Sequence, residues 1–194
     1  MSYTNARTPA LLQGFAIPPN REPAHYALEL AALVLAGGES SRLHQKHVRG
    51  DARAQSVSVW TTDQRGPDLF ALRVVLSERA TLAELERSVE AELARLGATG
   101  PTEEELARGK ARVSSDVVFS LESNLHRATQ LGEFELYWGD ARLLSRELSR
   151  YQAVTAGEVR DAVKKYLTKA RSSTVHVLPV GPAPAKSKPP ETTR

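Results

Sequence analysis

One stretch of the sequence, residues 24–43, is apolar enough to constrain everything around it. The first thirteen residues of the stretch contain only two clearly polar side chains, His25 and Glu29, which we expect to form an exposed hydrogen-bonded pair. From residue 30 to residue 36 the run is apolar on every side. A helix that is apolar all round must be covered on all sides, so we predict a central helix. It is too short to span a membrane, and Gly37 with Gly38 provides a natural helix C-terminus.

The composition indicates one soluble domain with a core of its own. The chain has 194 residues, of which 41% are hydrophobic and 25% are charged. Its formal net charge is +3, but about two of these charges belong to the residues after 180, which include three cationic side chains and one anionic side chain, that of Glu191. A nucleic-acid-binding protein concentrates positive charge on its folded body, so we expect no nucleic-acid partner. The sequence has no cysteine and therefore leaves both the bacterial periplasm and the cytoplasm open as compartments.

The patterning divides the chain into three regions. Residues 1–9 show no signal-peptide pattern and are expected to be an N-terminal boundary segment of a longer protein. Residues 10–180 form the folded domain, and residues 181–194 form a Pro/Lys-rich disordered tail.

Within the domain, hydrophobic periodicity predicts an α+β fold. Patterns typical of strands occur at 10–17, 55–60, 69–76 and 174–178, and the period changes to about 3.6 residues from 81 to 167. We therefore expect a mixed, mostly antiparallel sheet with a helical layer packed on one face. One of the helices should end near Gly139 and use Leu125 and Leu136 on its apolar face. Three capping boxes predict helix starts, at Thr81 with Glu84, Thr102 with Glu105, and Thr155 with Glu158.

A second short helix is predicted over residues 42–48. Ser40 or Ser41 is expected to cap it, and Arg42 to tether the loop. His44 and His47 stand three residues apart in it and could hold a metal ion, but two surface histidines explain them more simply.

Four sequence segments, taken in their order along the chain, carry a resemblance to a known family. They are residues 35–43 (Leu-Ala-Gly-Gly-Glu-Ser-Ser-Arg-Leu), 101–106 (Pro-Thr-Glu-Glu-Glu-Leu), 121–140, and 154–159 (Val-Thr-Ala-Gly-Glu-Val) together with 165–168 (Lys-Tyr-Leu-Thr). This combination resembles the pitrilysin/insulinase family of zinc metallopeptidases over about residues 10–179. The resemblance implies a half-domain of the pitrilysin/processing-peptidase type, two of which close over an extended peptide.

The resemblance also implies which half this is. In that family one half carries a His-x-x-Glu-His zinc motif on a helix, and the other half lacks it and completes the substrate chamber. None of the five histidines here lies in such a motif, and the corresponding helix has Leu-Ala-Ala-Leu-Val-Leu at residues 30–35. We therefore expect no catalytic residue and no metal ligand in this chain. Zinc is expected in a partner half, which is either part of the same polypeptide or a separate subunit.

In such non-catalytic halves an arginine and, a few residues later, a tyrosine point into the chamber. The resemblance places the arginine at Arg49 and the tyrosine position at Gln55, with a loop one residue shorter between them. A glutamine donates a hydrogen bond from a different place than a tyrosine does. We therefore expect Arg49 and Gln55 to bind substrate rather than to assist the reaction.

The sequence thus predicts a non-catalytic, substrate-enclosing half of a zinc metallopeptidase that is inactive alone. The alternative is a catalytically dead scaffold or assembly subunit of the same fold, which Gln55 favours modestly. A face meant for the partner half could also pair two copies of the isolated chain.

Overall fold

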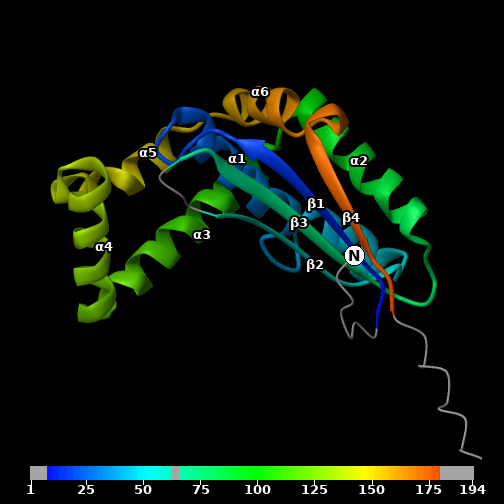
Figure 1. Cartoon of the computed structure of the whole chain (residues 1–194). Helices are drawn as coiled ribbons and strands as arrows, with labels where there is room; N and C mark the ends of the chain where they lie inside the picture. The colour runs from blue at the N-terminus through cyan, green and yellow to red at the C-terminus, as the bar shows by residue number, and fades with distance from the viewer. Residues whose placement is uncertain (1–7, 63–65, 180–194) are drawn as a thin grey trace, which may run out of the picture.

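A four-stranded antiparallel sheet covered by helices on one face forms the domain (Figure 1). The computed structural model describes residues 8–62 and 66–179, so the expected tail and most of the boundary segment lie outside the described residues. Strand β1 (Ala10–Ile17) pairs with β3 (Asp68–Leu76) and with β4 (Ser172–Val177). Strand β2 (Ala54–Thr61) pairs with β3, so β2 and β4 are the two edges. The α+β prediction is confirmed.

Helix α1 (Pro23–Ala36) is the buried central helix that the apolar stretch predicts. Pro23 occupies its first turn, where the missing N–H is no loss, and the N–H of Gly37 donates to the carbonyl of Leu33 at 2.8 Å at its end. Its side chains pack against the inner face of the sheet, where the rings of Phe15 and Phe70 meet edge to face with centroids 6.2 Å apart.

Three of the other helices, α2 (Leu82–Thr99), α3 (Glu103–Glu122) and α6 (Ala156–Tyr166), begin where the capping boxes predict. The chain also forms α4 (Asn124–Trp138) and α5 (Glu147–Ala153), with the 3-10 turns η2 (Ala141–Arg146) and η3 (Lys169–Arg171). All three capping boxes form with both of their hydrogen bonds, as predicted.

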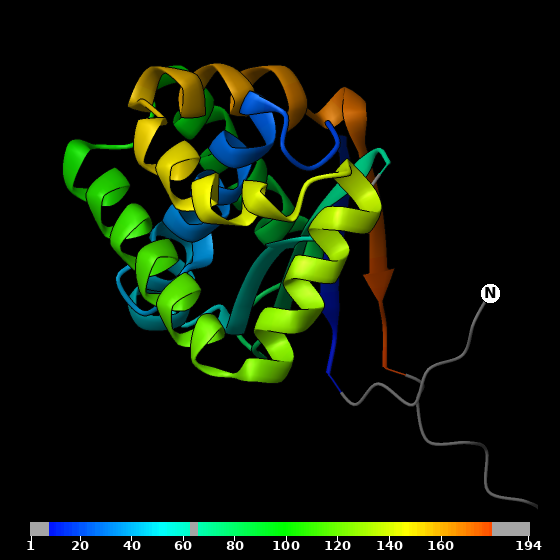
Figure 2. The same ribbon diagram turned by 90° about the vertical axis from the view of Figure 1, so that its left-hand side faces the viewer.

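Helices α3 and α4 form a V-shaped hairpin at one end of the molecule (Figure 1), which faces the viewer in Figure 2. The sequence predicted that α4 would use Leu125 and Leu136 as its apolar face, but these side chains are 79% and 74% exposed. The prediction of packing was wrong because the spacing of leucines shows an apolar face without showing what covers it. Within this chain, α4 contacts mainly α3 and η2.

The segment predicted as a short helix over 42–48 is a wider π-helix, η1 (His44–Gly50). Its wide turn is closed by the N–H of Asp51, which donates to the carbonyl of Lys46, five residues earlier. The predicted serine cap is not found among the described residues: η1 begins without a side-chain hydrogen bond to its first N–H groups, and the Ser41 hydroxyl donates to the carbonyl of Gly38 at 2.5 Å. With this geometry Leu43 and His47 are both fully buried.

Candidate functional site

A cleft of about 450 Å³ opens between the edge strand β2 and helices α1, α3, α4 and α5. We call it the β2 cleft. Its apolar wall includes Leu33, Val59 and Val113, and its polar groups include Glu29 and Tyr151. Both helices of the α3–α4 hairpin contribute residues to its lining, among them Val117 and Gln130. Because β2 is an edge strand, one side of its backbone carries N–H and C=O groups without a strand partner, which suits the pairing of an extended peptide.

Glu29 joins three elements at the inner end of the β2 cleft. Its carboxylate accepts hydrogen bonds from the hydroxyl of Thr61 at 3.1 Å and from the hydroxyl of Tyr151. Burial and the negative charge of Glu29 raise the pKa of Tyr151, so its phenol stays protonated. The carboxylate of Glu29 already accepts two hydrogen bonds, and the phenol of Tyr151 stays protonated. We therefore assign the pair a structural role in the wall of the cleft and do not assign a general base or a nucleophile to it.

His25 lies behind Glu29 and is fully buried, which corrects the prediction of an exposed pair. Its Nδ1 is 3.1 Å from the carbonyl of Pro18 and 3.8 Å from the carboxylate of Asp68, and its Nε2 is 3.8 Å from Glu29. Burial lowers the pKa of His25, but the hydrogen bonds and charges of these neighbours outweigh it and raise the pKa above its ordinary value. The spacing of His25 and Glu29 was visible in the sequence, whereas Asp68 comes from a distant strand.

Both predicted binding residues lie on the surface near the start of β2. The guanidinium of Arg49, on η1, donates to the carboxylate of Glu39 at 3.0 Å, and the two side chains are 61% and 75% exposed. Gln55 is exposed at a β-bulge, where Ala54 and Ser56 pair with successive residues of β3. No hydrogen bond joins Arg49 to Gln55 in the described parts of the chain, but their exposure leaves both accessible to a ligand.

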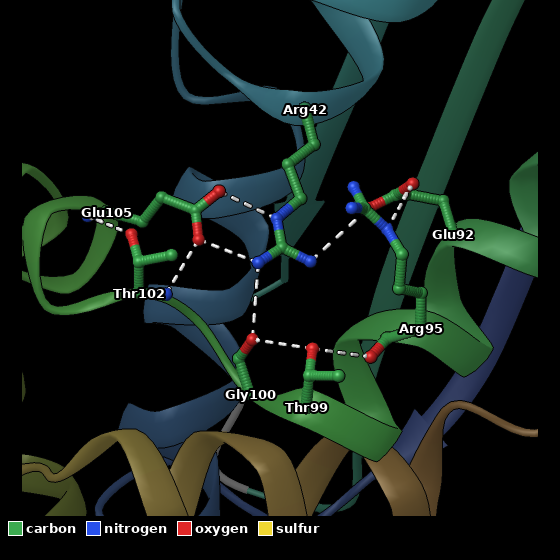
Figure 3. A network of polar contacts seen from close by, with 7 residues as sticks. All are labelled: Arg42, Glu92, Arg95, Thr99, Gly100, Thr102 and Glu105. Atoms are coloured by element: carbon green, nitrogen blue, oxygen red, sulfur yellow. Dashed lines mark hydrogen bonds and ion pairs between the residues drawn. The ribbon is translucent and has the colours of Figure 1, made fainter.

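Arg42 holds the loop that precedes η1 against α2 and α3 (Figure 3). Its Nε and Nη2 each donate to one carboxylate oxygen of Glu105 at 2.7 Å, and Nη1 donates to Glu92 at 3.3 Å. Nη2 also donates to the carbonyl of Gly100 at 3.2 Å. The hydrogen bonds from Arg42 hold the pKa of Glu105 below its usual range. The expected tethering role of Arg42 is thus present in the structure.

The two histidines of η1 are not directed at a common point. His47 is fully buried, which corrects the prediction of a surface residue, and its Nδ1 lies 3.1 and 3.3 Å from the carboxylate oxygens of Asp51. Its Nε2 lies 3.0 Å from the hydroxyl of Ser88, while Nδ1 of His44 lies 3.2 Å from the carbonyl of Glu39. Burial lowers the pKa of His47.

The described residues do not offer a zinc site. Among them, no group of three or more His, Cys, Asp or Glu side chains is arranged to hold a metal ion. The central helix α1, which stands where the resemblance expects the zinc motif, presents buried alanine, leucine and valine side chains instead. The free edge of β2 suits the pairing of an extended chain.

Residues 3–113 match the family model described as the peptidase M16 inactive domain. None of the curated proteins matches the chain. Over the described residues, no helix has the length and apolar character needed to cross a membrane.

Solved structures share the fold over most of the chain. The inactive peptidase domain of a proposed zinc protease from Bordetella parapertussis matches with a TM-score of 0.82 and 24% identity, covering 92% of this chain and 95% of that one. A proposed zinc protease from Bordetella pertussis matches with a TM-score of 0.80 and 24% identity over 90% and 94% of the two chains. A protease from Helicobacter pylori matches with a TM-score of 0.81 and 18% identity, but the match covers 90% of this chain and only 42% of that protease.

Proposed function

Since the chain belongs to the family of peptidase M16 inactive domains, we propose that it encloses peptide substrates when it is paired with a zinc-bearing half. It is the non-catalytic half of an M16-type zinc protease, and the resemblance to the pitrilysin/insulinase family is confirmed. The observation that carries the proposal is that this chain matches only 42% of the Helicobacter pylori protease. The rest of that protease is long enough to contain a second half. Zinc and the hydrolytic residues would belong to that second half.

The surface around β2 supports a role in holding the substrate. An extended peptide along the free edge of β2 would pair through its backbone, and the β2 cleft would receive an apolar side chain next to Trp60, which is 41% exposed. Arg49 could exchange its exposed contact with Glu39 for a carbonyl of the peptide, because an exposed ion pair is weak. Gln55 would add one hydrogen-bonding group beside it.

Reconstituted peptide cleavage tests this proposal. The chain alone, with zinc present, should not cleave a peptide, and adding the His-x-x-Glu-His half should produce cleavage. Replacing Arg49→Ala should lower kcat/KM about tenfold, mainly through KM, because one hydrogen bond from a charged donor is lost. Arg53→Ala is the matched control, since this neighbouring arginine is 42% exposed and contacts Asp51 instead. Equal effects of the two substitutions would contradict a specific role for Arg49.

A scaffold or assembly subunit of the same fold is the second candidate function. It is favoured by Gln55, which brings no phenol to the position where the active relatives are expected to have one. It would predict that this half adds no cleavage to the zinc-bearing half and that Arg49→Ala changes nothing. Binding of the two halves without any gain in activity would decide for the scaffold.

A further inference from the structure

A second pocket, of about 490 Å³, lies between α2, α6 and the strands β1 and β4, and it shares no lining residue with the β2 cleft. We call it the α2–α6 pocket. On α2 its wall includes the small residues Ala94, Gly97 and Ala98, whose spacing places them on one face of the helix. Gly97 lets α2 approach the backbone of α6 closely, and the pocket opens beside this contact. The rest of the apolar wall includes Phe15, Leu93, Val163 and Leu167.

Among the described residues that line the pocket, one polar side chain is buried. Gln13 lies among the inward-facing residues of β1 and is only 2% exposed. Its Nε2 donates to the hydroxyl of Thr174 on β4 at 3.4 Å, while its Oε1 is buried and accepts no hydrogen bond from any described residue. A buried carbonyl oxygen without a donor is unfavourable, so a donor brought by a ligand would be bound selectively.

Three charged residues line the pocket, and two of them form an ion pair: the ammonium of Lys169 lies 2.9 Å from the carboxylate of Glu90. The third, Lys164, is exposed to solvent, where a single ammonium attracts an ionic head group only weakly. A volume of this size is that of pockets that hold small molecules, which are typically apolar with a few polar groups to fix orientation.

We propose that the α2–α6 pocket binds a mainly apolar small molecule that donates one hydrogen bond to Oε1 of Gln13. The site is independent of peptide binding at β2, since it is built from other elements. Its ligand is defined by an apolar body and a single hydroxyl or N–H group.

Fluorescence titration with N-phenyl-1-naphthylamine tests the site, because this probe has an apolar body and one N–H group and brightens in apolar surroundings. The full chain should bind one probe molecule saturably. Ala98→Leu, which fills the pocket, should weaken binding at least tenfold. Leu136→Ala, on the exposed face of α4 outside the pocket, should leave the affinity unchanged. An affinity for the probe that is unchanged by Ala98→Leu, or that is lost with Leu136→Ala, would overturn the proposal.

Gln13→Leu tests the hydrogen bond separately and removes a buried polar group, so it should not impair folding. It should weaken binding of N-phenyl-1-naphthylamine about tenfold and leave unchanged the binding of 1-phenylnaphthalene, which lacks the donor. An equal response of the two probes to Gln13→Leu would overturn the role assigned to Oε1. Thermal unfolding of each variant shows that the fold is retained.

Discussion

At the scale of single residues, the two buried histidines should respond to pH in opposite directions. The pKa of His25 is raised in the folded state by Glu29, Pro18 and Asp68, so its contribution to stability is present below its unfolded pKa, about 6.5, and is lost as the pH rises through the raised value. The pKa of His47 is lowered by burial, so its contribution grows as the pH rises toward about 6.5.

Urea unfolding between pH 5 and pH 8 measures this difference. The free energy of unfolding of the wild-type chain, minus that of His25→Gln, should fall as the pH rises. The same difference for His47→Gln should increase. Two differences with the same sign of slope would show that the neighbours of His25 do not outweigh its burial.

Arg42 is the residue whose ion pairs should matter most for stability. Arg42→Ala removes two hydrogen bonds to the carboxylate of Glu105 and one to that of Glu92, which Arg95 still contacts at 2.7 Å, and we expect a loss of about 2 kcal/mol in the free energy of unfolding. Arg108→Ala is the control, because Arg108 pairs with Glu104 on the open surface of α3 and should contribute less than about 1 kcal/mol. Similar losses in urea titrations of the two variants would contradict the tethering role of Arg42.

At the scale of elements, local signals in the sequence predicted most of the fold. The three capping boxes gave three helix starts because each box is complete within four residues, and strand periodicity gave the four strands of the sheet. The π-helix η1 was missed because its wide turn depends on burying His47 against Ser88 of α2, a contact between distant residues. The cluster of His25, Glu29 and Asp68 was missed for the same reason.

The contact between α2 and α6 depends on Gly97. A Cβ atom at this position would lie 3.2 Å from Cα of Lys164, which is backbone and cannot move aside easily. We expect Gly97→Ala to lower the free energy of unfolding by about 1–3 kcal/mol, because it overpacks this contact. Gly132→Ala in α4 is the matched control, since a Cβ there meets nothing within 4 Å and should stabilise the helix by up to about 1 kcal/mol. Thermal unfolding of both variants should therefore show shifts of opposite sign.

At the scale of the whole molecule, the α3–α4 hairpin leaves apolar side chains exposed. Phe119 on α3 is 67% exposed, and Leu125 and Leu136 on α4 are 79% and 74% exposed. Exposed apolar groups gathered on one element are typical of a surface that another protein covers. In the proposed function that cover is the zinc-bearing half. When this half is absent, we expect two copies of the chain to cover each other's hairpins.

Light scattering over a range of concentrations tests this expectation. The isolated chain should be a dimer at high concentration, and the double variant Phe119→Ser with Leu125→Ser should be a monomer. Val175→Ser is the control, because Val175 is also 57% exposed but lies on β4, and this variant should still dimerise. Adding the zinc-bearing half should dissociate the dimer, since both compete for the hairpin. A wild-type chain that stays monomeric at high concentration would show that the hairpin does not drive self-association, and the surface that meets the partner half would then have to be sought elsewhere.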